Sequence, residues 1–290
     1  TIPLFLISLL LLILVNFIGI EVKGSKRWLN LYLFQLQPIE ILKPFFILIT
    51  ATLLSLNDKK KFVFNYFFSF FILLIIVFLL INQPDIGQTI LLITTWGTII
   101  FLSGVNVFFI ISMVLVFFGI LGSAVIFLPE KFGYITKRLT TFFDPEKGDS
   151  FQSDKALEAI KQGGLKGQGM GEGILKDSVP EAHTDYIIAV ITEEFGSMIS
   201  ILIICIFLYV AFRVIKLCLN EEEDDLKISL AGLITILIYQ TFIHVGVNTN
   251  LLPTTGMTLP FLSYGGSSLI GSSILAGVIL NFTKNRYDVG

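Results

Sequence analysis

The sequence predicts an all-α polytopic membrane protein, and three observations lead to this prediction. Of the 290 residues, 54% are hydrophobic and 14% are charged, whereas a soluble domain carries roughly 25% charged residues. Apolar runs recur along the chain, each long enough to cross about 30 Å of hydrocarbon. Polar stretches rich in turn-forming residues separate these runs. We therefore expect a single membrane domain over residues 1–290.

Eight apolar runs are long enough to be membrane-spanning helices. The predicted spans are residues 3–20, 39–56, 62–81, 86–104, 106–128, 187–217, 227–247 and 266–283. The first run has no basic start and no small-residue cleavage site, so we expect a spanning helix rather than a signal peptide. Residues 129–186 form one large predicted loop between the fifth and sixth spans. Because the chain starts at Thr1 without Met, we also expect residues upstream of it.

Basic residues in short flanking segments predict the orientation of the helices. Most of them follow even-numbered spans, which places those ends on the cytoplasmic side. These residues are Lys59, Lys60, Lys61, Arg213, Lys216, Lys284 and Arg286. Lys23, Lys26 and Arg27 lie on the other side and oppose this orientation. The loops with unusual residues then all face outward: 21–38, 82–85, 129–186 and 248–265.

The net charge argues against nucleic-acid binding, and the cysteine spacing argues against a disulfide. The net charge of −2 gives no basic surface for nucleic acid. Cys205 and Cys218 lie on one predicted helix, about 20 Å apart, which is too far for a disulfide. We interpret both cysteines as packing residues.

The first outer loop carries candidate substrate-binding residues. Lys26 and Arg27 could bind phosphate groups or simply be solvated. Trp28 could equally be an interfacial anchor. Glu40 and Lys43 are spaced i, i+3 at the start of the second span, which predicts an ion pair just inside the membrane.

Two further loops allow structural as well as functional interpretations. Asp85 directly precedes a predicted helix, so N-capping explains it without any further role. Glycines at alternate positions in residues 163–173 permit positive φ and close approach to a ligand. A nucleotide fingerprint is a weak interpretation because no strand precedes these glycines. We favour a flexible hinge.

The stretch from Pro180 to Asp185 gathers two acids and a histidine where the large loop meets a membrane helix. A carboxylate at this border is costly to desolvate and is therefore a functional candidate. Glu193 lies eight positions after Asp185, about 12 Å along one helical face, and Glu194 follows it. These carboxylates could act as a general base or bind a divalent cation, and no other cofactor is indicated. In the alternative interpretation, Thr184 and Asp185 cap the helix that begins near Tyr186 and His183 steadies the loop.

The last outer loop, residues 248–265, is too apolar for a solvated loop and too rich in Pro and Gly for one helix. We expect a re-entrant segment that lines a cavity. His244 lies near the outer end of the preceding helix, where packing is its expected role.

Four segments together resemble the SEDS family (shape, elongation, division and sporulation). They are Gly24–Trp28 with Gln37 and Pro38, Gln83–Gly87, Pro180–Asp185 with Glu193 and Glu194, and Pro253–Ser268. The resemblance implies a ten-helix fold, of which two helices lie upstream of this chain. It also implies a membrane glycosyltransferase that polymerises lipid II on the outer face of the bacterial inner membrane. The segments Gly169–Gly173 and Leu252–Met257 are more similar to the division members, which work at the septum, than to the elongation members.

The resemblance also implies roles for particular residues and partners. Asp185 matches the family's conserved aspartate and is implied as the general base on the acceptor hydroxyl, while undecaprenyl pyrophosphate leaves from the donor with inversion. The candidate substrate-binding residues are Lys26, Arg27, Trp28, Asp85, His183, Thr184, Glu193, Glu194, Ser263, Tyr264, Gly265 and Gly266. A class B penicillin-binding protein, which is a transpeptidase, and other division proteins are the implied partners.

Two other functions remain as alternatives. A lipid flippase or transporter places ionisable groups near the midplane of its helices, whereas here the helix centres are nearly free of charge. This pattern disfavours a proton-coupled transporter but leaves a passive lipid path open. A non-catalytic division scaffold would not need Asp185.

Overall fold

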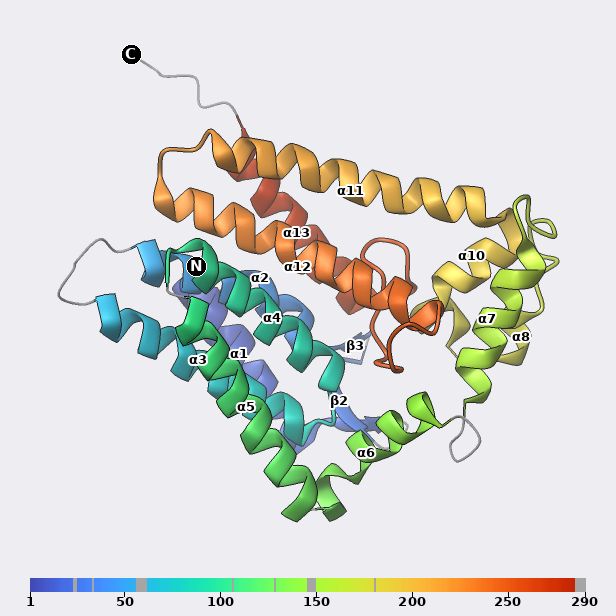
Figure 1. The fold of residues 1–290 in the computed structure, drawn as a ribbon, viewed down its shortest axis with the longest axis horizontal. Helices are drawn as coiled ribbons and strands as arrows, with labels where there is room; N and C mark the ends of the chain where they lie inside the picture. The colour runs from blue at the N-terminus through green and yellow to red at the C-terminus, as the bar shows by residue number, and fades with distance from the viewer. Residues whose placement is uncertain are drawn as a thin grey trace. The chain divides into compact units, whose positions relative to one another are not determined.

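The computed structural model describes residues 1–22, 25–32, 34–55, 62–105, 107–127, 129–144, 150–179 and 181–284 (Figure 1). The chain forms two compact units, which are described separately. The first unit comprises Thr1–Gly104, Leu208–Tyr239 and Gly265–Gly290. The second unit comprises Val105–Phe207 and Gln240–Tyr264.

The first unit is a helical bundle organised around α2 (Pro38–Ser55). Its other helices are α1 (Ile2–Ile18), α3 (Phe62–Asn82), α4 (Ile86–Leu102), α13 (Gly266–Thr283), the later part of α11 (Ser197–Leu219) and the earlier part of α12 (Asp224–Asn248). Helix α2 packs against α1, α3, α4 and α13. Gly271 allows the closest approach, because a Cβ atom there would lie 2.5 Å from the carbonyl oxygen of Glu40. Apolar residues on several sides therefore make α2 the buried centre of this unit.

A small antiparallel sheet follows α1, and the sequence analysis did not predict it. The strands are β1 (Ile20–Val22), β2 (Ser25–Asn30) and β3 (Gln35–Leu36), in the order β1-β2-β3. Ile20 pairs with Trp28, and Leu29 pairs with Leu36. Leu29 and Leu36 pack with Val15 of α1 in one hydrophobic cluster. β1 and β3 are too short to show the alternation that identifies a strand, and β2 reads SKRWLN, which does not alternate. Lys23 and Gly24 lie outside the described residues.

The second unit contains the large loop, which is mostly helical. Its elements are α5 (Val107–Phe127), α6 (Pro129–Phe143), α7 (Phe151–Gly163), α8 (Leu175–Ser178), α9 (Ala182–Asp185) and α10 (Ile187–Phe195), with the remaining parts of α11 and α12. Helix α7 packs along α10, and α8 lies against both (Figure 1). Their core joins small and large apolar side chains: Ala156, Ala159, Leu175, Val179, Ala182, Tyr186, Ala189 and Val247.

Five helices among the described residues are long and apolar enough to cross a membrane. They are Pro38–Ser55, Phe64–Asn82, Ser197–Leu219, Asp224–Asn248 and Gly266–Thr283. Helices α1 and α4 are apolar but shorter, so the count of eight spans stays a prediction. The predicted span 187–217 is wrong as one continuous helix. Gly196, at φ 87°, ends α10, and α11 begins at Ser197.

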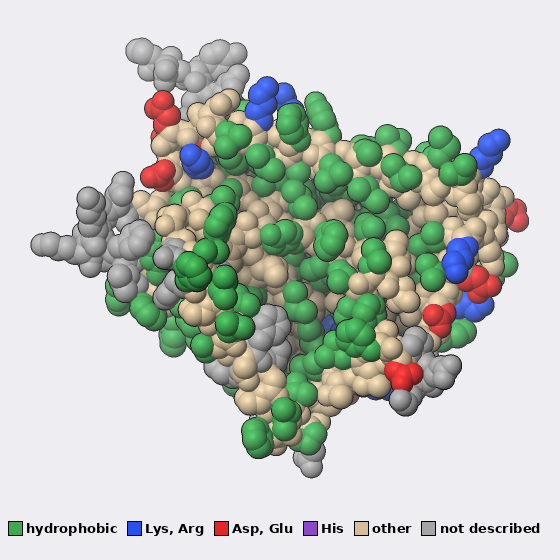
Figure 2. All heavy atoms as spheres, viewed as in Figure 1, with side chains coloured by type: hydrophobic (Ala, Val, Ile, Leu, Met, Phe, Trp, Pro, Cys, Tyr) green, Lys and Arg blue, Asp and Glu red, His purple; other side chains and the backbone are tan. Residues whose placement is uncertain are grey.

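Helix α11 exposes most of its surface, and only 17% of its membrane-length window is buried. Hydrophobic side chains, among them Leu202, Tyr209 and Phe212, cover it, and Figure 2 shows such side chains over much of the visible face. A helix that is apolar all round and exposed is typical of a lipid-facing span. Of the basic residues that predicted the orientation, Lys59, Lys60, Lys61 and Arg286 lie outside the described residues.

Candidate functional site

Asp185 is the last residue of a single helical turn, α9. Several hydrogen bonds of this turn share one acceptor, the carbonyl oxygen of Glu181. Glu181 adopts the left-handed conformation, at φ 64°. Its carbonyl oxygen accepts hydrogen bonds from the backbone N–H groups of Thr184, at 2.9 Å, and Asp185, at 3.0 Å. The Thr184 hydroxyl donates to the same oxygen at 2.9 Å. These bonds fix the turn locally. Pro180 lies outside the described residues.

Three consecutive carbonyl groups of this turn accept hydrogen bonds from residues far along the chain. The carbonyl of His183 accepts from the N–H of Tyr264 at 3.0 Å. The carbonyl of Thr184 accepts from the Ser263 hydroxyl at 2.6 Å. The carbonyl of Asp185 accepts from the Asn248 side-chain amide at 3.0 Å. We call these three donors the carbonyl clamp. Carbonyls at a helix end have no partner within the helix, so the clamp both satisfies the turn and fixes its position.

Asn248 is the central member of the clamp, and its side chain is fully buried. Its Nδ2 also donates to the His244 carbonyl at 2.8 Å, and its Oδ1 accepts from the N–H of Ala189 at 3.1 Å. One amide therefore connects α12, the Asp185 turn and the first turn of α10. The sequence analysis treated Asn248 only as the start of a loop. Its position four residues after His244 in an apolar helix is the signal that could have identified it.

The predicted capping of a helix near Tyr186 by Thr184 and Asp185 is wrong. Tyr186 itself occupies the N-cap position of α10 and makes no side-chain cap bond. Thr184 is engaged with Glu181. Asn248 supplies the capping acceptor from another helix, because its Oδ1 receives an N–H group in the first turn of α10.

Tyr186 directly follows the turn and is buried, with 3% of its surface exposed. Burial, with a smaller contribution from the neighbouring Asp185 carboxylate, raises the pKa of Tyr186 to about 12, while Arg138 acts in the opposite direction. The phenol is therefore neutral at physiological pH. The side chains of Asp185 and Arg138 thus both lie within electrostatic reach of this ring.

Glu193 has a structural role in the second unit, and its predicted pairing with Asp185 stays a prediction. Its carboxylate accepts hydrogen bonds from the backbone N–H groups of Ile174, at 3.0 Å, and Leu175, at 3.1 Å, at the start of α8. Only 1% of Glu193 is exposed. The break at Tyr186, with φ −123° and ψ 26°, also interrupts the helix on which the common face depended. Glu193 therefore holds α8 against α10.

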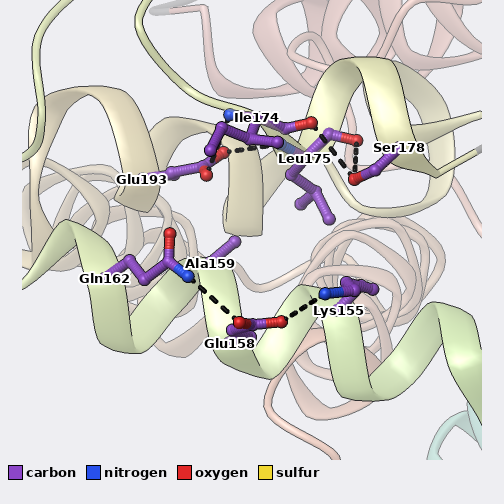
Figure 3. Close-up of a pocket in the computed structure, with 8 residues that line it drawn as sticks. All are labelled: Lys155, Glu158, Ala159, Gln162, Ile174, Leu175, Ser178 and Glu193. Carbon is purple, nitrogen blue, oxygen red and sulfur yellow. Dashed lines mark hydrogen bonds and ion pairs between the residues drawn. The ribbon is translucent and has the colours of Figure 1, made fainter.

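A cavity of about 150 Å³ lies beside Glu193, between α7, α8 and α10 (Figure 3). Lys155 donates to Glu158 at 2.6 Å at its rim, and this contact lowers the pKa of Glu158. Gln162 donates to the other oxygen of Glu158 at 3.2 Å. Both acids that line this cavity therefore have partners within the protein.

The glycine-rich segment packs closely against the end of α10, which corrects the hinge interpretation. A Cβ atom at Gly163 would lie 2.0 Å from the carbonyl oxygen of Thr192, and one at Gly167 would lie 2.3 Å from that of Glu194. Backbone N–H groups of residues 168 and 169 donate to the carbonyls of Glu193 and Glu194. The Glu194 side chain forms an ion pair with Lys176 at 3.2 Å. The close approach that the glycines permit is therefore an approach to the protein's own backbone.

The last loop is non-helical, as predicted, and it supplies two of the predicted site residues. The Ser263 hydroxyl also accepts from the N–H of Leu259 at 2.8 Å, which organises this loop. The rings of His183 and Tyr264 lie edge to face, with centroids 5.5 Å apart. His244 is buried, and its Nδ1 lies 2.7 Å from the Met257 carbonyl oxygen, which agrees with its expected packing role.

The remaining predicted site residues belong to the first unit. Asp85 is the N-cap of α4, as predicted, and accepts from the N–H of Gln88 at 3.3 Å. The Arg27 guanidinium donates to the carbonyls of Gln83 and Pro84, and its Nε lies 3.9 Å from the Asp85 carboxylate. Arg27 therefore fixes the turn before α4, so its phosphate-binding role stays a prediction.

Other residues of the first unit fill structural positions too. Glu40 and Lys43 form the predicted ion pair at 2.8 Å, both buried, and Gln88 donates to Glu40 at 2.7 Å. Lys26 is exposed, and Trp28 is half-buried in β2. Gly265 is the N-cap residue of α13, and Gly266 is its first residue.

No group of three or more His, Cys, Asp or Glu side chains that could hold a metal ion occurs among the described residues. Of the two acids that the sequence proposed for a cation, Glu193 accepts hydrogen bonds from the backbone of Ile174 and Leu175. The possible divalent cation stays untested.

The fold and the site together indicate the class of protein. The chain is a multi-pass helical membrane protein whose candidate acid lies in a structured loop outside the spanning helices. A family model described as "Cell cycle protein", which joins FtsW, RodA and SpoVE, matches residues 1–288. The chain therefore belongs to the SEDS family, which confirms the resemblance seen in the sequence.

Individual relatives agree along nearly the whole chain. A protein of Caulobacter vibrioides named "Probable peptidoglycan glycosyltransferase FtsW" is 36% identical over 279 residues, which are 96% of this chain and 70% of that protein. The stage V sporulation protein E of Bacillus subtilis is 34% identical, over 96% of this chain and 77% of that protein.

Two solved structures show the same fold. A chain of a peptidoglycan synthase complex has a TM-score of 0.79 at 27% identity, covering 99% of this chain and 81% of that one. The rod shape determining protein RodA of Thermus thermophilus has a TM-score of 0.69 at 26% identity, covering 99% of this chain and 78% of that one.

Proposed function

We propose that this protein is a peptidoglycan glycosyltransferase that polymerises lipid II on the outer face of the bacterial inner membrane, during septal wall synthesis. The observation that carries this proposal is the match of nearly the whole chain to relatives named peptidoglycan glycosyltransferase FtsW, at 36% and 37% identity for two of them. The geometry of the second unit supports Asp185 as the reacting group. It presents this acid on a backbone fixed by the carbonyl clamp.

Asp185 acts as the general base in this proposal. Its carboxylate takes the proton from the acceptor hydroxyl as that oxygen forms a bond to the anomeric carbon of the donor. The bond from this carbon to the pyrophosphate breaks, and its electron pair leaves with undecaprenyl pyrophosphate. One displacement inverts the anomeric centre. A positioned general base contributes typically 10²–10⁴-fold to such a step.

The fixed backbone explains how a loop residue can serve this role. A general base must lie within hydrogen-bond reach of the proton that it abstracts, and a small displacement weakens the reaction strongly. Asn248 and Ser263 bond the carbonyls of Asp185 and Thr184, which lie on either side of the Asp185 Cα atom. His183 belongs to the turn, and its ring lies beside that of Tyr264. These two residues are the proposed substrate contacts of this unit.

A class B penicillin-binding protein is the proposed partner. The similarity to a chain of a peptidoglycan synthase complex that couples polymerisation to crosslinking supports this pairing. The exposed apolar surface of α11 is available for lipid or for a partner helix.

The experiment supplies lipid II to the protein purified with its class B penicillin-binding protein and compares it with Asp185→Ala. We expect glycan chains from the unchanged protein and at least a 100-fold slower rate from the variant. Polymerisation at the normal rate by Asp185→Ala would contradict the assignment of the base. Lipid transfer without polymer from the unchanged protein would favour the flippase instead.

A further inference from the structure

The first unit contains a second cavity, far larger than the one beside Glu193. Its volume is about 420 Å³, and residues of α2, α4, α11 and α12 line it. The lining gathers the last residues of α2, α4 and α11 with the first turns of α12. These are the helix ends that the basic flanks predict on the cytoplasmic side. The cavity is thus separate from the Asp185 turn, which belongs to the other unit.

The wall of the cavity is mostly aliphatic. Leu54, Ile228 and Ile234 are buried side chains that line it, together with the buried thiol of Cys218. Small side chains such as Ala231 leave the space open. Ligand sites are typically cavities of roughly 300–1,000 Å³ with apolar walls and a few convergent polar groups. The wall therefore suits a hydrocarbon chain.

The rim of the cavity is polar and carries both signs of charge. Asp224 and Lys227 lie one helical turn apart at the start of α12, and Ser55 and Ser103 contribute hydroxyl groups from α2 and α4. The preceding segment adds further acids, Glu221, Glu222 and Glu223, on the same side. The acid-rich surroundings repel an anionic headgroup, whereas a headgroup with its own ammonium and phosphate complements Asp224 and Lys227.

We propose that this cavity binds one zwitterionic phospholipid with a primary amine, such as phosphatidylethanolamine, from the cytoplasmic leaflet. One acyl chain occupies the aliphatic wall. The phosphate lies against Lys227, and the ammonium group lies against Asp224. The site is independent of the glycosyltransferase proposal, because it uses no residue of the second unit.

The test uses the full chain reconstituted in nanodiscs with equal amounts of phosphatidylethanolamine, phosphatidylglycerol and phosphatidylcholine, followed by native mass spectrometry. We expect one retained phosphatidylethanolamine in the unchanged protein and at least tenfold less in Ala231→Phe, which fills the cavity. The matched control is Ala276→Phe, a half-buried alanine of α13 in the same unit, which keeps the lipid. Equal retention in both variants, or equal retention of phosphatidylglycerol, overturns the proposal.

A second measurement does not depend on the folding of a cavity-filling variant. In a Cys205→Ser background, Cys218 is the cysteine available to an alkyl maleimide. Added phosphatidylethanolamine slows its labelling at least fivefold if the lipid occupies the cavity, and Asp224→Asn with Lys227→Gln removes that protection. Labelling that is unaffected by the lipid shows that the site is not a lipid site.

Discussion

Asp85 and Asp185 each lie shortly before a helix, and the contacts around them involve different parts of the two residues. The Asp85 carboxylate accepts the N–H of Gln88 and the side-chain amide of Gln37, and it lies beside Arg27. Around Asp185 the clamp instead bonds the main chain, through the carbonyls of residues 183–185. The hydrogen bonds to its carboxylate show that Asp85 stabilises the turn before α4. The structure therefore shows a capping carboxylate at Asp85 and a main chain held from distant segments at Asp185.

Among the residues that support Asp185, the largest effect is expected from Asn248, which bonds its carbonyl. Asn248→Ala removes the donor to the Asp185 carbonyl and the acceptor for α10. A displacement of about 1 Å at a reacting group costs on the order of 100-fold, so we expect kcat to fall by that factor with KM nearly unchanged. Steady-state polymerisation, corrected for the folded fraction, measures both constants.

The matched control for this variant is Gln240→Ala. Gln240 is another buried amide of α12, and its side chain donates to the Thr258 carbonyl at 2.9 Å. Gln240→Ala should lower the free energy of unfolding by about as much as Asn248→Ala does, while the folded variant keeps its kcat. Equal losses of kcat in the two variants would show that Asn248 acts only through stability.

The next effect concerns Glu193, whose carboxylate bonds the backbone at the start of α8. Glu193→Ala leaves the buried N–H group of Leu175 and the partly buried N–H group of Ile174 without their acceptor. Each such loss costs roughly 1–3 kcal/mol, so we expect a fall of at least 2 kcal/mol in the free energy of unfolding. Thermal unfolding measures it, with the exposed Glu158→Ala as a control whose midpoint stays unchanged. An unaltered midpoint for Glu193→Ala would refute its structural role.

Alkaline pH should loosen the Asp185 turn through Tyr186. The pKa of Tyr186 is raised to about 12 in the folded protein, above about 10 in the unfolded chain. Stability from the neutral phenol is therefore complete below pH 10 and is lost as pH rises toward 12, by about 2 kcal/mol. Tyr186→Phe should abolish this part of the loss in pH-dependent thermal unfolding, whereas Tyr209→Phe, at an exposed tyrosine, should not. Identical profiles for the two variants would refute the effect.

The smallest effect is expected at Asp85. Asp85→Ala removes the cap of α4 and should lower the free energy of unfolding by about 1 kcal/mol. Asp85→Asn keeps a capping oxygen and should retain most of that stability. Chemical denaturation of the two variants distinguishes them, and a larger loss in Asp85→Asn than in Asp85→Ala would argue for a role of the charge itself.

Local features were predictable from the sequence, and contacts between distant segments were not. The Asp85 cap and the Glu40–Lys43 pair follow from spacings of three residues. The role of Asn248 depends on a contact across 59 residues with Ala189, and that of Glu193 on contacts across 18 and 19 residues. No periodicity records such contacts. The small sheet was not predicted for another reason: two of its strands are only three and two residues long, and the six residues of β2 do not alternate between polar and apolar.

The glycine-rich segment shows the same limit. Alternate glycines indicate either flexibility or close approach, and only the position of α10 decides between them. The family resemblance, in contrast, identified Asp185 without any three-dimensional information. Its motif pointed to the residue, and the structure adds the clamp that holds it.

The most direct test of this account is the rate of lipid II polymerisation by Asp185→Asn and Asp85→Asn, prepared in the same way with the partner transpeptidase. Both substitutions remove one charge and keep the shape of the side chain. We predict a loss of at least 100-fold for Asp185→Asn and a rate within a few-fold of the unchanged protein for Asp85→Asn. Normal polymerisation by Asp185→Asn, or an equal loss in both variants, would contradict the central claim.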